Sequence, residues 1–219
     1  MFIGHYSISL AARAAQPALP LWVYVGAAQL LDMLWCVFIM IGIERVAPAP
    51  QVTEGLAFLY YPWSHSLAAA AVWAGLTTQV AGRAFRVPAR AATALGLVVL
   101  SHWLLDFLVH RPDLEIAPGV GLEVGLGLWD HAALELALEV ALLLAAGGLL
   151  LAQWRRQRRR LWPLAAFLLF AAAFFAAMRQ APPPAEVDPV ALGTAGLALY
   201  LGFVLLAWLV ERFSPATVQ

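Results

Sequence analysis

The sequence predicts an all-α membrane protein: a polytopic bundle of about six transmembrane helices, preceded by a short helix that is only half inserted. Hydrophobic residues make up 63% of the chain and charged residues 12%, whereas a soluble domain carries about a quarter charged residues. The apolar residues gather in runs long enough to cross ~30 Å of hydrocarbon. Proline and glycine separate these runs, which is typical of turns between helices.

Each apolar run is expected to form one transmembrane helix, and the expected spans are roughly 20–42, 62–82, 89–110, 128–152, 161–178 and 190–211. The short N-terminal helix should cover Gly4 to Ala15 and end at the segment Gln16-Pro17-Ala18-Leu19-Pro20. We expect two units. Residues 1–152 would form a bundle that carries the polar side chains, and residues 161–211 a two-helix transmembrane hairpin that serves as a scaffold.

Arginine predicts the orientation of the bundle. The run from Arg155 to Arg160 and the group Arg83, Arg86 and Arg90 mark two loops as cytoplasmic, because positive residues accumulate on that side of a membrane. These loops are an even number of crossings apart, so the two assignments agree. The sequence therefore predicts a multi-pass protein of a plasma (inner) membrane with its C-terminus in the cytoplasm.

Composition also excludes some classes of function. The chain has 13 basic and 13 acidic residues and a formal net charge of zero, so no global basic field would attract nucleic acid. Cys36 is the single cysteine, which rules out an intramolecular disulfide and a cysteine-based zinc cage.

Ionisable residues are costly inside a membrane and usually have a function there. Counted from the cytoplasmic end of each expected helix, Asp32, His65, His102, Asp106 and Glu135 fall in one layer in the outer half of the bilayer. His5 reaches the same depth if the N-terminal helix pairs antiparallel with the first span, and His110 and His131 lie about a turn higher.

The spacing within two helices indicates metal ligands. His102, Asp106 and His110 recur at every fourth residue, which places them on one helix face. His131 and Glu135 repeat this spacing, with Glu139 one turn further on. Imidazole and carboxylate are ligands of zinc and related divalent ions. The sequence therefore predicts a site for a divalent metal ion, with Zn²⁺ as the expected ion. A buried hydrogen-bond network is the alternative.

In chain order the candidates read His5, Asp32, His65, His102-x3-Asp106, His110, His131-x3-Glu135. This order resembles the zinc-dependent phospholipase C and single-strand nuclease superfamily, all-α hydrolases with a trinuclear zinc site. The strings Pro62-Trp63-Ser64-His65-Ser66 and Ser101-His102-x3-Asp106 also look like the membrane-bound metal-dependent hydrolase family. The resemblance covers residues 4–139.

The resemblance implies one to three metal ions. One would be held by Asp32, His65, His102 and Asp106. A second would be held by His110, His131 and Glu135, and a third by His5 with a bridging Asp106.

A bound divalent metal lowers the pKa of water toward ~7, and Glu139 or Asp130 would accept the proton beside the bridging Asp106. Arg45 and Arg111 would bind a phosphate headgroup. The leading hypothesis is a metal-dependent hydrolase that cleaves a lipid or lipid-like (phospho)ester near the outer face. The alternatives are an intramembrane zinc amidase of the ceramidase type and a divalent-cation transporter or sensor.

Overall fold

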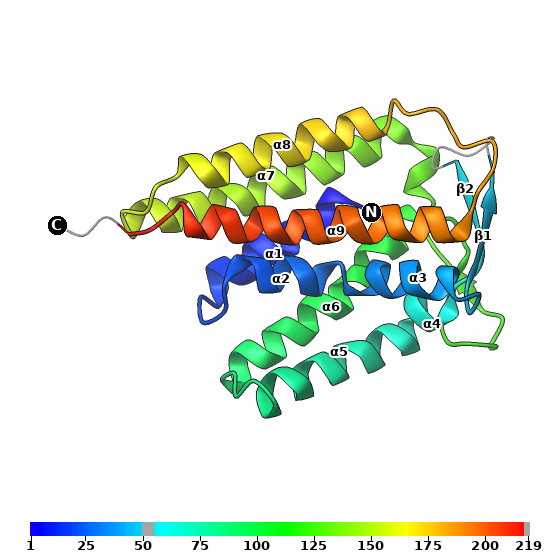
Figure 1. Cartoon of the computed structure of the whole chain (residues 1–219), viewed down its shortest axis with the longest axis horizontal. Helices are drawn as coiled ribbons and strands as arrows, with labels where there is room; N and C mark the ends of the chain where they lie inside the picture. Colours follow the sequence, from blue (N-terminus) through cyan, green and yellow to red (C-terminus); the bar gives the residue numbers. More distant parts are fainter. Residues whose placement is uncertain (50–54, 217–219) are drawn as a thin grey trace.

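The computed structural model describes residues 1–49 and 55–216, and its helices run along the long axis of the molecule (Figure 1). The helices are α1 (Ile3–Ala15), α2 (Leu21–Ala28), α3 (Leu30–Met40), α4 (Pro62–His65), α5 (Leu67–Arg83), α6 (Ala89–Val109), α7 (Ala132–Arg156), α8 (Trp162–Met178) and α9 (Pro189–Arg212), with a 3-10 turn η1 at Leu128–Asp130. The predicted helical fold class is confirmed.

Two short antiparallel strand pairs lie outside that prediction. β1 (Arg45–Pro48) pairs with β2 (Leu56–Tyr60), and β3 (Leu114–Glu115) pairs with β4 (Glu123–Val124). They lie at one end of the bundle, whereas the two arginine-containing turns, at 84–88 and 157–161, lie toward the other end with the C-terminus (Figure 1). Both turns therefore lie on one side, as two loops on the same face of a membrane must.

The prediction of six spans is not supported. Within residues 1–49 and 55–216, three helices are long and apolar enough to cross a membrane: α6, α7 and α9. A fourth span results if α2 and α3, which meet at a bend of 49°, count as one broken helix. The chain thus has three to four candidate spans and is consistent with a membrane protein.

The other two expected spans are shortened for local reasons. The run 62–82 is divided at Ser66, whose hydroxyl accepts a hydrogen bond from the Ala69 N–H at 3.1 Å and so caps α5. Both α5 and α8 have 17 residues, which at 1.5 Å per residue is about 25 Å, less than the ~30 Å of hydrocarbon.

The break between α2 and α3 lies at Gln29 and sets the direction of the residues that follow it. Asp32 lies in the first turn of α3. A break frees backbone groups from the helical ladder, and these need partners elsewhere. The carbonyl oxygen of Ala28 has such a partner in the Nδ1 atom of His102, at 2.6 Å. The helix break therefore frees a backbone carbonyl that binds His102, one of the predicted metal ligands.

The core contains α1 and extends across the predicted unit boundary at 152–161. Ile3, Tyr6 and Leu10 of α1 are fully buried and belong to one hydrophobic cluster with Leu143 of α7 and Phe203 of α9. The two predicted units therefore share one core, and α8 and α9 pack on the helices that carry the polar residues.

Candidate metal centre

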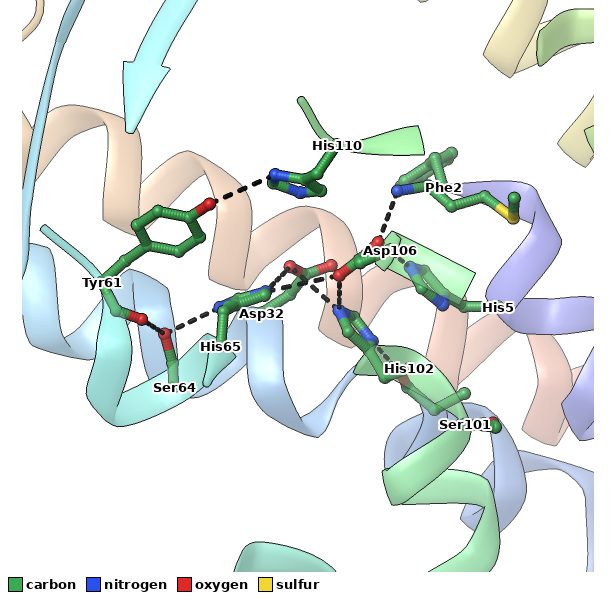
Figure 2. A network of polar contacts seen from close by, with 12 residues as sticks. Phe2, His5, Asp32, Tyr61, Ser64, His65, Ser101, His102, Asp106 and His110 are labelled. Carbon is green, nitrogen blue, oxygen red and sulfur yellow. Dashed lines mark hydrogen bonds and ion pairs between the residues drawn. The ribbon is translucent and has the colours of Figure 1, made fainter. Parts of the chain in front are cut away.

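Five of the predicted ligands converge from four helices (Figure 2). His5 comes from α1, Asp32 from α3, His65 from α4, and His102 and Asp106 from α6. They form two overlapping groups, each with its ligand atoms within 4.8 Å of one another: His5, Asp32 and His102, and then His65, His102 and Asp106. The shared histidine makes this one cluster.

Asp106 is the centre of the cluster. Its Oδ1 atom lies 3.2 Å from His5 Nε2 and 2.7 Å from the α-amino nitrogen of Met1. Its Oδ2 atom lies 3.0 Å from His102 Nε2 and 3.7 Å from His65 Nε2. One carboxylate thus touches every histidine of the cluster, which is the position of a bridging ligand.

The hydrogen bonds of His102 determine which of its nitrogens carries the proton. A carbonyl oxygen only accepts, so the 2.6 Å contact with Ala28 requires a proton on Nδ1. The Nε2 atom then points into the cluster. It faces Asp106 Oδ2 at 3.0 Å and Asp32 Oδ1 at 3.5 Å and has no hydrogen bond. A ring nitrogen buried against two carboxylates carries a further proton or binds a cation.

His65 is oriented in the same way through a relay. Ser64 Oγ lies 2.6 Å from Glu44 Oε2 and 2.7 Å from His65 Nδ1. Because the hydroxyl donates its one proton to the carboxylate, its oxygen accepts from Nδ1, and His65 Nε2 is left as a lone pair 3.3 Å from Asp32 Oδ1. Two imidazoles therefore direct their Nε2 atoms toward the same two carboxylates.

Glu44 is buried beside β1 and accepts a second hydrogen bond, from the Ser64 N–H at 2.8 Å. Burial raises the pKa of this carboxyl group, while the two bonds from Ser64 favour its ionised form and oppose the shift.

The third imidazole, His5, is stacked on His102 with ring centroids 3.7 Å apart. Its two ring nitrogens are buried without hydrogen bonds. Buried polar atoms usually have partners, and Nε2 faces Asp106 Oδ1 at 3.2 Å, so this ring is placed to contribute a further ligand to the cluster. Three imidazoles and two carboxylates are a donor set that suits Zn²⁺ and related divalent ions, and the residues present fit such an ion.

The second predicted ligand set, His110, His131 and Glu135, is not brought together. His110 is buried at the end of α6, with Nδ1 3.0 Å from Asp113 Oδ1, and burial lowers its pKa. His131 is exposed at the start of α7. Glu135 is buried and lies 2.9 Å from Arg179. Each of these three residues thus has its own surroundings, and no group of potential metal ligands among the described residues contains them.

Two predicted proton acceptors also lie away from the cluster. Glu139 accepts hydrogen bonds from the backbone N–H groups of Phe2 and Gly4, both at 2.9 Å, and so caps the first turn of α1. Asp130 is exposed and forms an ion pair with Arg111 at 2.7 Å. Of the three acids predicted to be catalytic, Asp106 alone lies in the cluster.

A cavity of about 680 Å³ opens beside the cluster. Polar groups line one side of it: Asp32, Tyr61, His65, Asp106 and His110. Apolar residues of α9 line another side: Ala191, Leu192, Ala195 and Leu199. The described residues that line this cavity do not include Arg45 or Arg111, which were predicted to bind phosphate.

The sequence-based prediction did not include Glu44, the Ala28 carbonyl or the α-amino group of Met1 as contributors to the site. Ser64 directly precedes His65 in the sequence, and this adjacency could have indicated a hydroxyl that supports the imidazole. Glu44 is a lone acid just beyond an apolar run, and only folding brings it to Ser64.

No family model, no curated protein and no solved structure matches this chain.

Proposed function

We propose that the protein is a membrane-embedded metal-dependent hydrolase in which Asp32, His65, His102 and Asp106, with His5 beside them, hold a divalent cation. The observation that carries the proposal is the convergence of three imidazoles and two carboxylates from four helices on one buried point. The Nδ1 atoms of His65 and His102 are bound by Ser64 and the Ala28 carbonyl, so both Nε2 atoms face Asp32 and Asp106. A divalent cation bound by these Nε2 atoms and carboxylate oxygens would balance the two negative charges, and Zn²⁺ fits the donor set.

A cation at this position would supply Lewis acidity, which activates water near neutral pH and polarises an ester or phosphoryl oxygen. The protein contributes orientation. The Ala28 carbonyl and the Ser64 hydroxyl hold two imidazoles in their ligand tautomers. The two oxygens of Asp106 face different histidines, so this carboxylate could bridge two ions. The predicted number of ions, one to three, includes that case.

His110 would carry the proton during hydrolysis. It lines the cavity and is held through Nδ1 by Asp113, which also accepts a hydrogen bond from Tyr61 at 2.9 Å. A histidine oriented by a carboxylate is a common general acid and base. Glu139 and Asp130 are committed to other partners, so His110 is the better candidate.

The lining of the cavity supports a lipid or lipid-like ester as the substrate. One wall carries the ligands and another is the apolar face of α9, so an amphiphile would place its linkage at the metal and its chain along the helix. We further propose that the cavity end faces the outside of a plasma membrane and the arginine-containing turns face the cytoplasm with the C-terminus.

Metal content tests the proposal. Purified wild type in detergent is compared with His102→Ala and Asp106→Ala by elemental analysis, and His131→Ala is the control because it removes an exposed histidine outside the cluster. We expect near-stoichiometric Zn²⁺ in wild type and in the control, and its loss in the two cluster variants.

Wild type that binds no divalent metal after reloading would contradict the proposal. If metal is present, release of product from phosphodiester, carboxylester and amide lipids separates the hydrolase from the amidase hypothesis. Metal uptake into vesicles without hydrolysis would favour a transporter instead.

A further inference from the structure

A buried ion pair lies in the same cavity but outside the metal cluster. Arg179 follows the end of α8, and Glu135 lies in the first turn of α7. Arg179 Nη1 is 2.9 Å from Glu135 Oε2, with 14% and 2% of the two side chains exposed. Both residues line the cavity together with Asp32, His65 and Asp106.

Arg179 is the one arginine among the described residues that line the cavity, and the chain contains no lysine. The carboxylates that share this lining are Asp32, Asp106, Glu135, Glu186 and Asp188. The Met1 α-amino group and the proposed cation would offset the charges of Asp32 and Asp106, which leaves Glu135, Glu186 and Asp188 to repel an anion on the side of the cavity around Arg179. Arg179 therefore provides the side-chain charge that would attract an anion there.

The pair leaves most of the binding capacity of Arg179 unused. A guanidinium has five N–H donors in a planar fork, and only Nη1 contacts Glu135. Glu135 Oε2 lacks a hydrogen bond, so the contact is electrostatic and poorly aligned. Within residues 1–49 and 55–216, the guanidinium makes no other polar contact, and Phe175 lies 6.0 Å below it. A bidentate oxyanion would be a better partner.

We propose that Arg179 binds the oxyanion of an amphiphilic substrate, a phosphate or a carboxylate attached to an apolar chain, and that Glu135 is its counter-ion when no substrate is bound. The apolar chain would lie against Leu192, Ala195 and Leu199 of α9. This inference rests on the proposed hydrolase function, because it names the substrate class for the same cavity.

Binding of single-chain amphiphiles tests the inference on the full chain. Dodecyl phosphate, dodecanoate and dodecanol are titrated into protein in a neutral detergent, and binding is followed by tryptophan fluorescence, since Trp35 and Trp129 line the cavity. We expect Arg179→Gln to weaken dodecyl phosphate binding about 10-fold or more, as for a lost charge-assisted hydrogen bond. Dodecanol binding should stay within about 2-fold. Comparison of the two anions shows whether phosphate or carboxylate is preferred.

Arg45→Gln is the matched control, because Arg45 is exposed and its guanidinium lies 5.4 Å from the Tyr60 ring. It should leave dodecyl phosphate binding unchanged. Glu135→Gln should strengthen binding, since it removes the competing carboxylate. The double variant Arg179→Gln/Glu135→Gln leaves no unpaired buried charge, so it tests the loss of anion binding if Arg179→Gln alone does not fold.

Equal dodecyl phosphate affinity in wild type and the double variant would overturn the inference. So would weaker binding in Glu135→Gln together with a lower melting temperature, which is the signature of a purely structural pair. The titrations are repeated after chelation of metal. An Arg179-dependent anion affinity that persists without metal supports this inference even if the metal proposal fails, and metal binding without Arg179 dependence refutes this inference alone.

Discussion

The two sides of the cavity differ in how their side chains are held. On the side formed by α1, α3, α4 and α6, two imidazoles are oriented by hydrogen bonds to a buried hydroxyl and a backbone carbonyl. On the side formed by α9, small and aliphatic residues face the same space. Polar side chains in this helical bundle are therefore positioned by supporting contacts, while the apolar wall offers only shape.

The largest effect is expected from metal removal. If the cluster binds a cation, ligand linkage adds about 2.7 kcal/mol to the stability of the folded state at a metal concentration 100 times Kd. A chelator should therefore lower the melting temperature of wild type by about 5–10 °C. His102→Ala, which lacks a ligand, should melt at the same temperature with and without chelator. Equal melting of wild type under both conditions would mean that the polar side is a metal-free network.

The support of His65 comes next. Ser64→Ala removes the hydroxyl that joins Glu44 to His65, and loss of such an outer partner typically weakens metal affinity about 10–100-fold. Competition with a fluorescent zinc chelator measures the affinity. Ser101→Ala is the control, because Ser101 adjoins His102 but its hydroxyl bonds the Val98 carbonyl of its own helix at 2.7 Å. Equal losses in both variants would contradict the relay.

Contact between the two sides of the cavity is tested with glycines of α9. A Cβ atom at Gly193 would lie 2.5 Å from Met40 Cγ and 2.6 Å from the Cys36 carbonyl of α3, so Gly193→Ala should cost about 1–3 kcal/mol. Gly202→Ala in the same helix meets nothing within 4 Å and should stabilise by about 0.5–1 kcal/mol. Thermal unfolding compares them, and equal melting temperatures would show that α9 packs loosely on α3.

The smallest effect is expected for Glu139→Gln, which tests whether Glu139 caps α1 or takes part in catalysis. Glu139→Gln retains one acceptor for the N–H groups of Phe2 and Gly4, so stability should fall by about 1 kcal/mol. Metal content and hydrolysis should persist. A variant with normal melting and no hydrolysis would instead restore Glu139 as the proton acceptor.

Local sequence pattern predicted part of the centre because the relevant spacing is local. His102 and Asp106 are one helical turn apart, so any helix there places them together. Apolar runs likewise predicted the membrane class. Counting depth along each expected helix also selected Asp32, His65 and His5, which the structure brings to Asp106.

The same reasoning failed where a contact or a break depends on distant residues. His131 and Glu135 have the same spacing as His102 and Asp106, yet one is exposed and the other faces Arg179. A helical repeat specifies a shared face and says nothing about which neighbour that face meets.

The amino-acid sequence by itself determined the helical membrane class and the residue types available for a metal. Tertiary structure decided the number of spans, through the break at Gln29 and the cap at Ser66. It also decided the tautomers of His65 and His102 and the pairing of Arg179 with Glu135. The physical reason is range: hydropathy and periodicity act within one helix, whereas hydrogen bonds and ion pairs join residues that only folding brings into contact.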